Sequence, residues 1–239
     1  MESICPMHVI AHIRSDFPTK FGIPRQSGLV EALRSTVIFE PDYRSAEALR
    51  GIEEYSHIWL IWQFSANAGL GWSPTVRPPR LGGNQRMGVF ATRSPFRPNP
   101  IGLSSVRLLG VENTRQWGPV LHVSGADLMD NTPIFDIKPY IPYGDCHPDA
   151  TGGFTDRKER RPLAVDCPSQ LLSLLPEDRR EALLGVLSND PRPAYQQDPD
   201  RVYGLAFAGF DVRFTVKDAL LRVCEIAPLS AEEEERHDS

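Results

Sequence analysis

Short segments rich in β-branched and aromatic residues dominate this chain up to Tyr143. Each is bounded by turn-forming residues, and no long stretch with helical spacing lies between them. Strands without alternating helices favour a mainly antiparallel sheet or barrel over a doubly wound parallel sheet. Residues 45–50 are expected to form one short helix, with Ser45 as its N-cap. The pattern predicts seven strands, over residues 9–14, 35–40, 57–64, 87–92, 102–109, 117–125 and 133–138.

The composition changes after Tyr143. A polar stretch with Gly152-Gly153 and a charged run is followed by leucines at helical spacing, which predict a helix over 176–187. Strands are expected at 203–207, 212–216 and 220–226, with a turn near Gly209. The sequence therefore predicts a mainly β protein with an N-terminal domain at 6–143, a linker at 144–164, a small α+β domain at 165–228 and an acidic, solvated tail at 229–239.

The bulk composition excludes several classes of protein. The 239 residues are 41% hydrophobic, which is enough for a packed core, but no apolar run approaches the roughly 20 residues that span a bilayer. The start of the chain lacks the features of an export signal. The four cysteines are far apart and form no C-x-x-C pair, which argues against a metal site and a disulfide framework. We expect a cytoplasmic protein that binds neither membrane nor metal.

The arginines are concentrated in one segment of an acidic chain. Between Tyr55 and Val111 there are six arginines and no acidic residue, whereas the whole chain has 26 Lys+Arg and 31 Asp+Glu. Six like charges without counter-charges repel one another unless a partner or the fold neutralises them. Guanidinium groups among Gly and Pro suit a rigid surface that binds phosphate or another polyanion. The alternative is a set of scattered surface arginines.

Two further segments could carry chemistry. Residues 91–104 contain three prolines that would hold Arg93, Arg97 and Asn99 stiffly for a ligand, although an ordinary Pro-rich connection is the alternative. Residues 127–140 bring three aspartates and a lysine together. Asp136 and Lys138 are two apart and would share one face of a strand, either as a functional pair or as a structural ion pair.

Several common motifs are missing from the sequence. There is no G-x-G-x-x-G after a strand, no P-loop and no G-x-S-x-G elbow, which argues against a Rossmann nucleotide site, a P-loop NTPase and an α/β-hydrolase.

Four separated motifs resemble those of one family. They are P-R-Q at 24–26, R-P-P-R-L-G-G-N at 77–84, F-A-T-R-S-P-F-R-P-N-P-I-G-L-S at 90–104 and D-x-x-D-x-T-P-x-x-D-I-K-P-Y at 127–140. In this order they resemble the TsaA-like, or TrmO, family, and residues 190–195 and 211–213 resemble the C-terminal part of its bacterial members.

The resemblance implies a fold, an activity and a partner. Family members have a single-sheeted β-barrel, act as homodimers and use S-adenosylmethionine to methylate N6 of N6-threonylcarbamoyladenosine at position 37 of threonine tRNA. The chain is then expected to bind tRNA. A non-catalytic RNA-binding module and a small-molecule methyltransferase on the same barrel are the alternatives.

The resemblance also implies three groups of site residues. The cofactor site is expected at Pro24, Arg25, Gln26, Ser65, Ala66, Arg93, Leu103, Asp127, Leu128, Met129 and Asp130. Some relatives have His-Gln where this chain has Ser65-Ala66. Candidates for a catalytic base are Asp136, Lys138 and Tyr140. Substrate binding is expected from Arg77, Arg80, Arg86, Arg97 and Asn99, with Arg192 and Tyr195 of the C-terminal domain.

Overall fold

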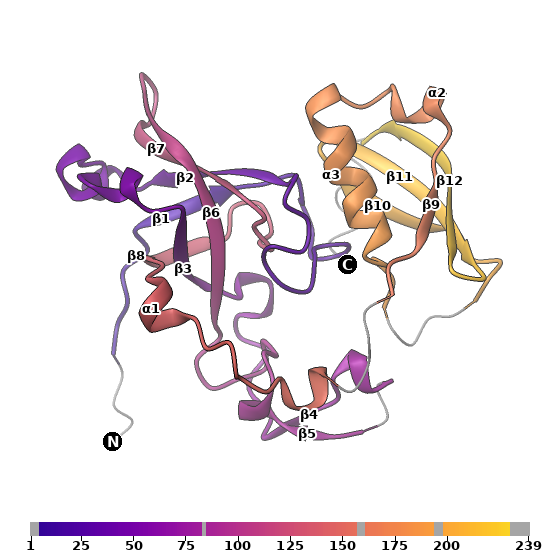
Figure 1. Ribbon diagram of the computed structural model, residues 1–239, viewed down its shortest axis with the longest axis horizontal. Helices are drawn as coiled ribbons and strands as arrows, with labels where there is room; N and C mark the ends of the chain where they lie inside the picture. The colour runs from indigo at the N-terminus through magenta and orange to yellow at the C-terminus, as the bar shows by residue number, and fades with distance from the viewer. Residues whose placement is uncertain (1–4, 83–84, 157–160, 194–197, 230–239) are drawn as a thin grey trace.

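The computed structural model describes residues 5–82, 85–156, 161–193 and 198–229 (Figure 1). Six strands close on themselves as a barrel in the order β1-β2-β7-β6-β3-β8, and every neighbouring pair is antiparallel. The strands are β1 (Ala11–Arg14), β2 (Arg34–Phe39), β3 (His57–Gln63), β6 (Ile101–Thr114), β7 (Gly118–Ser124) and β8 (Pro133–Pro139). The mainly β expectation is confirmed.

Buried and more exposed residues alternate along the strands, and the buried ones form the barrel core. In β3 the buried positions are Ile58, Leu60 and Trp62, and in β6 they include Val106 and Leu108. Side chains two residues apart on a strand point to one face, so these residues meet inside the barrel. They pack with inward-facing residues of the other strands, among them Ile13, Val37, Leu121, Val123 and Ile134.

The connections around the barrel contain single helical turns. Between β2 and β3 lie the 3-10 helices Pro41–Tyr43, Ala46–Leu49 and Ile52–Glu54. The second of these is the expected short helix, and Ser45 is at its N-cap position as expected, although the Ser45 side chain forms no capping hydrogen bond.

The connection between β3 and β6 forms a small lobe. It contains β4 (Thr75–Val76), β5 (Met87–Gly88) and the turns Ser65–Asn67, Pro79–Leu81 and Val89–Ala91. The expected strand over 87–92 was wrong beyond Gly88. Its partner β4 has only two residues, so the ladder ends and the chain turns into a 3-10 helix.

The C-terminal part has a four-stranded sheet. Its order is β10-β11-β12-β9, with β9 parallel to β12. The predicted helix and three strands are confirmed, and the hairpin turn falls at Ala208 and Gly209. The elements are α1 (Pro142–Asp145), a turn at Gly153–Thr155, β9 (Ala164–Asp166), α2 (Ser169–Leu172), α3 (Glu177–Ser188), β10 (Tyr203–Phe207), β11 (Phe210–Lys217) and β12 (Leu220–Pro228). No helix among the described residues is long and apolar enough to cross a bilayer.

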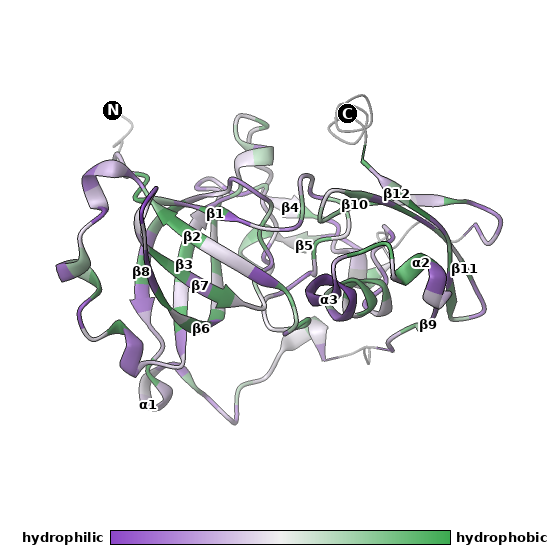
Figure 2. Ribbon diagram, turned by 90° about the horizontal axis from the view of Figure 1, so that it is seen from above, coloured by the Kyte–Doolittle hydropathy of each residue, from purple (hydrophilic) through white to green (hydrophobic). Residues whose placement is uncertain are grey.

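The second core joins the C-terminal sheet to a loop of the barrel. Seen from above, α3 lies between the barrel and the sheet (Figure 2). Phe17, Val30 and Leu33, from the β1–β2 connection, share one buried cluster with residues of α3 and β10–β12. The side chain of Leu205 lies against Gly22 of the same connection. The connection thus belongs to the barrel in sequence and to the C-terminal core in packing.

Candidate functional site

A pocket of about 450 Å³ lies at one end of the barrel. β1, β3 and β7 end there and β2, β6 and β8 begin there, because neighbouring strands are antiparallel. Connections from different parts of the chain therefore converge on the same place. The β1–β2, β3–β6 and β7–β8 connections supply most of its walls.

Most of the residues expected at the cofactor site gather around this pocket. Nine of the eleven line it: Pro24, Arg25, Gln26, Ser65, Ala66, Arg93, Leu103, Asp127 and Met129. The two exceptions, Leu128 and Asp130, point elsewhere. Apolar walls with a few polar groups are typical of a small-molecule site.

The β1–β2 connection carries Pro24, Arg25 and Gln26 into the pocket. Gly22 of this loop has φ +83°, which favours glycine, and a Cβ there would lie 2.2 Å from Cδ1 of Leu205. The Arg25 guanidinium donates a 3.4 Å hydrogen bond to the Arg192 carbonyl. The C-terminal part therefore supports the pocket loop directly.

The arginines of the Pro-stiffened segment are already engaged. Arg93 donates to the side-chain oxygen of Gln26 across the pocket. Arg97 is half-buried and donates to the carbonyls of Thr92 (3.1 Å) and Ser94 (3.2 Å). Arg97 therefore fixes the shape of its own loop, and only its other N–H groups remain for a ligand. Asn99 is exposed and does not line the pocket.

Asp127 is the acidic side chain that lines the pocket. Ser104 donates a 2.5 Å hydrogen bond to its Oδ1 atom. Burial raises the pKa of Asp127, while the bond from Ser104 and the charge of Arg93 oppose that rise. The carboxyl group is thus held in a partly dehydrated position beside several cations.

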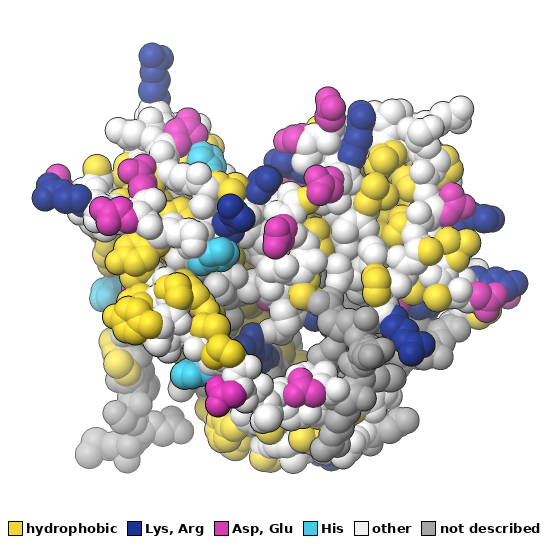
Figure 3. Space-filling view, in the orientation of Figure 1, with side chains coloured by type: hydrophobic (Ala, Val, Ile, Leu, Met, Phe, Trp, Pro, Cys, Tyr) yellow, Lys and Arg dark blue, Asp and Glu magenta, His cyan; other side chains and the backbone are white. Residues whose placement is uncertain are grey.

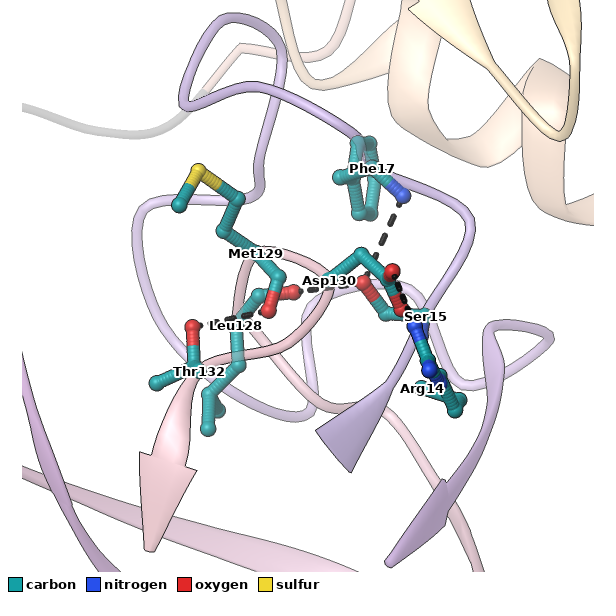
Figure 4. A network of polar contacts seen from close by, with 7 residues as sticks. All are labelled: Arg14, Ser15, Phe17, Leu128, Met129, Asp130 and Thr132. Carbon is teal, nitrogen blue, oxygen red and sulfur yellow. Dashed lines mark hydrogen bonds and ion pairs between the residues drawn. The ribbon is translucent and has the colours of Figure 1, made fainter. Parts of the chain in front are cut away.

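Asp130 joins two loops instead of facing this pocket. Its carboxylate accepts hydrogen bonds from the Ser15 amide (2.9 Å) and from Arg14 (3.1 Å), as Figure 4 shows. Ser15 Oγ in turn donates to the Leu128 carbonyl at 2.9 Å, and the Leu128 side chain is buried in the barrel core. These contacts tie the end of β1 to the β7–β8 connection.

A second cleft separates the barrel from the C-terminal part. Asp16, Asp130, Asp178 and Arg179 line it, and charged side chains of both signs stand around the notch in Figure 3. Arg179 pairs with Asp16 at 3.0 Å across it. Burial raises the pKa of Asp16, and Arg179 opposes that rise.

The candidates for a catalytic base do not line the pocket. A bulge lies in the β3–β8 pairing: Trp62 is opposite Ile134 and Ile61 is opposite Asp136. Asp136 and Lys138 therefore fall on the outer face, where they form a 2.9 Å ion pair. The Tyr140 ring packs on Trp59 with 5.6 Å between centroids. The pKa of Tyr140 is raised, mainly by desolvation, which disfavours the phenolate.

The remaining expected substrate residues are dispersed. Arg77 and Arg86 are exposed on the β4–β5 lobe, where Arg86 donates to Thr75 at 2.8 Å. Arg192 holds Asp190 through two bonds of 2.8 and 3.0 Å, and only 13% of its side chain is exposed. The Arg80 side chain and Tyr195 lie outside the described part of the chain.

Several lining residues were not expected from the sequence. They include Lys20, Trp62, Gln63, Thr92 and Thr132. Trp62 lies inside a barrel strand, where the strand pattern indicates core. Lys20 is four residues before Pro24, so its position in the same loop could have indicated that it lines the pocket. No group of three or more His, Cys, Asp or Glu side chains within the described ranges could hold a metal ion.

Comparison with known proteins identifies the family. The model of the tRNA-methyltransferase O N-terminal domain matches residues 12–146, and that of the TrmO C-terminal domain matches residues 161–229. The chain belongs to the TrmO family.

Members of the TrmO family align with nearly the whole chain. An Escherichia coli tRNA (adenine(37)-N6)-methyltransferase is 42% identical over 92% of this chain and 96% of its own. A Pseudomonas aeruginosa relative, whose name describes an S-adenosylmethionine-dependent methyltransferase, is 43% identical over 91% and 96%. The crystal structure of TrmO from Pseudomonas aeruginosa superposes with a TM-score of 0.77 at 34% identity, covering 95% of this chain and all of that one.

Proposed function

We propose that this protein transfers a methyl group from S-adenosylmethionine to N6 of N6-threonylcarbamoyladenosine at position 37 of threonine tRNA. The observation that carries the proposal is the convergence of three of the four family motifs on one pocket that holds a partly buried carboxylate and several cations. Relatives named for this kind of reaction support it.

The pocket suits the chemistry of the cofactor. S-adenosylmethionine has a cationic sulfonium, an aromatic base and a methionine tail with both charges. Asp127 offers an anion, Arg25 and Arg93 offer cations, and Phe64 and Met129 offer apolar surface. When bound, the cofactor supplies the methyl group together with its own leaving group. These residues would hold and orient it.

Positioning supplies most of the catalysis in this proposal. Methyl transfer is an in-line displacement, so holding the two reactants in line lowers the activation free energy of the reaction. The acceptor nitrogen is a poor nucleophile, and Asp136, Lys138 and Tyr140 lie outside the pocket. We therefore propose that the pocket orients the nitrogen and that solvent removes its proton late in the reaction.

Two cations are proposed to recognise the threonyl carboxylate of the substrate. Lys20 lines the pocket, and its ammonium has no partner among the described residues. Arg97 has N–H groups beyond those that bind its own loop. A charge-assisted hydrogen bond to either group would favour the modified adenine over the unmodified one.

The arginines of the β4–β5 lobe are proposed to bind the tRNA backbone. Within the described chain, Arg77 and Arg86 make no ion pair with a carboxylate, so their charges stay available for phosphates. The C-terminal part, residues 165–228, is proposed as a second domain that adds tRNA affinity.

A cytoplasmic location is also proposed, because a tRNA substrate and four cysteines without disulfide bonds both fit it.

A homodimer is proposed to complete the pocket. Large apolar side chains are exposed in the β3–β6 connection, including Trp72 at 55% and Phe90 at 76%. Exposed apolar groups of this size around a site are typical of an interaction surface. Light scattering would measure the mass in solution, and a monomer that stays fully active at low concentration would contradict this assembly.

The central experiment measures transfer of labelled methyl from S-adenosylmethionine to threonine tRNA, with and without the threonylcarbamoyl group. Mass spectrometry of the digested nucleosides would locate the methyl. We expect transfer only to the modified tRNA. Equal rates on the unmodified transcript would contradict the substrate, and cofactor binding without any transfer would favour a non-catalytic RNA-binding module.

A further inference from the structure

Three residues from separate segments form a buried chain of hydrogen bonds beside the pocket. The indole Nε1 of Trp62, on β3, donates to Ser104 Oγ, on β6, at 2.9 Å. Ser104 Oγ donates to Asp127 Oδ1, after β7, at 2.5 Å. Ser104 is 1% exposed and Trp62 is 7% exposed. Ser104 is a polar residue on the inward, buried face of β6, which it shares with Gly102 and Val106.

The chemistry of the indole fixes the direction of the chain. The Trp side chain can only donate, so Ser104 Oγ must accept from it. The Ser104 hydrogen is then directed to a second acceptor, and the Asp127 carboxylate is that acceptor. The 2.5 Å separation is within the range of an O–H group bonded to a carboxylate.

The indole itself is held by its neighbours. A Cβ on Gly102 would lie 2.2 Å from Trp62 Cε2, so the ring occupies the space that any other residue at this position would need. Phe64 packs on the ring with 4.4 Å between centroids. Gly102 and Phe64 therefore fix the donor that begins the chain.

We propose that Trp62 and Ser104 are positioning residues, which hold the Asp127 carboxylate ionised and oriented so that its remaining acceptor sites meet a donor on the cofactor. The inference rests on the proposed function, since it concerns the same pocket. Neither residue would touch the methyl group. They act through Asp127.

The charges around Asp127 define what the chain adds. Burial raises the pKa of this carboxyl, and Ser104 is the side chain that lowers it by a hydrogen bond. Arg93 lowers it by its charge, and Lys20, Arg25 and Arg97 line the same pocket. Removing the Ser104 hydroxyl leaves those cations in place. The pKa of Asp127 should then rise further, and protonation should begin at a higher pH.

The test measures Asp127 directly, in ligand-free protein. Carbon-13 NMR of the carboxyl group, assigned with Asp127→Asn, gives its titration in the parent, Ser104→Ala, Ser104→Thr and Trp62→Phe. We expect the pKa to rise in Ser104→Ala, to rise less in Trp62→Phe, and to match the parent in Ser104→Thr, which keeps the hydroxyl. An unchanged titration in a folded Ser104→Ala would overturn the proposal.

Binding of S-adenosylhomocysteine, measured by calorimetry across pH, supplies the second readout. We expect Ser104→Ala to bind about tenfold more weakly at neutral pH, and its loss of affinity on acidification to begin at a higher pH than in the parent. A uniform loss with the parent's pH profile would indicate a merely structural role and contradict the proposal. If the parent fails to bind this ligand, the proposed function fails, while the NMR titration still tests the hydrogen-bond chain.

Discussion

The ring of Phe17 meets the ring of Phe207 edge to face, with 5.4 Å between their centroids. Phe17 belongs to the loop that carries Pro24, Arg25 and Gln26 to the pocket, and Phe207 ends β10 in the C-terminal sheet. Beside this contact, the Ala208 amide donates to the Asp16 carbonyl at 2.8 Å. The pocket loop is therefore shaped by residues almost two hundred positions later in the chain.

Phe207→Ala should weaken cofactor binding although Phe207 does not line the pocket. Its loss leaves a cavity under the loop, and the free energy of unfolding should fall by about 3–5 kcal/mol. Phe214→Ala is the matched control, because that buried ring stacks on Tyr203 within the sheet. Urea denaturation and calorimetry should find both variants destabilised and only Phe207→Ala impaired in affinity. If folded Phe207→Ala bound the cofactor as tightly as folded Phe214→Ala, the C-terminal core would not shape the pocket loop.

Gly102→Ala should cost about 1–3 kcal/mol of stability and loosen the pocket. The added methyl would collide with the Trp62 indole, which cannot move without losing its bond to Ser104. Gly110→Ala on the same strand is the control, since a Cβ there meets nothing within 4 Å. Denaturant titration of the two variants tests this. A Gly102→Ala protein as stable as Gly110→Ala would show that the indole has room to shift.

Asp127→Asn should stabilise the protein at neutral pH while it weakens cofactor binding. The pKa of Asp127 is raised in the folded state, so its contribution to stability is present below the unfolded-state pKa and is lost as pH rises through the folded value. The Asn side chain carries no charge, so it removes the free-energy cost of burying an ionised carboxylate. Its side-chain oxygen can still accept the hydrogen bond from Ser104. The stability difference from the parent should be positive at pH 7 and vanish toward pH 3. Thermal melts at both pH values measure it, and a less stable Asn variant at pH 7 would contradict the assignment.

Asp136→Ala and Lys138→Ala should leave cofactor affinity unchanged. Both side chains are substantially exposed, and an exposed ion pair contributes about 0–1 kcal/mol. Stability should change by no more than that amount. A large fall in turnover with either variant would mean that the pair reaches the substrate from a second subunit.

Arg77→Gln should weaken tRNA binding and reduce the slope of log K against log salt by about 1, as expected when one phosphate contact is lost. Arg107→Gln is the control, because Arg107 is also exposed and lies in the same acid-free segment but on a barrel strand. Filter binding at several salt concentrations distinguishes them. If both variants showed the same slope, the tRNA backbone would not contact Arg77.

The sequence predicted the barrel strands and the pocket motifs well, for a physical reason. Strands such as β3 alternate strictly between apolar-inward and mixed-outward residues, and the motifs lie in the connections where they meet. It could not predict the side on which Asp136 falls. Ile134 points inward, and without the bulge Asp136 would follow it, two residues later. One extra residue in the ladder turned a candidate base toward solvent.

The sequence also could not predict which groups the arginines bind. Arg97 and Arg192 look alike in sequence, as guanidinium groups among prolines. One holds two carbonyls of its own loop, and the other holds Asp190 and accepts Arg25 on its carbonyl. Such contacts depend on backbone geometry that periodicity and composition do not encode.

The parallel pairing of β9 with β12 has a consequence for the order of folding during synthesis. β12 ends at Pro228, so the C-terminal sheet closes only after the residues up to Pro228, far beyond the pocket loop, have been made. At about 5–20 residues per second, Phe17 waits about 10–40 s between its own synthesis and that of its last neighbours. The barrel's pocket loop is thus translated well before the residues that complete its packed conformation.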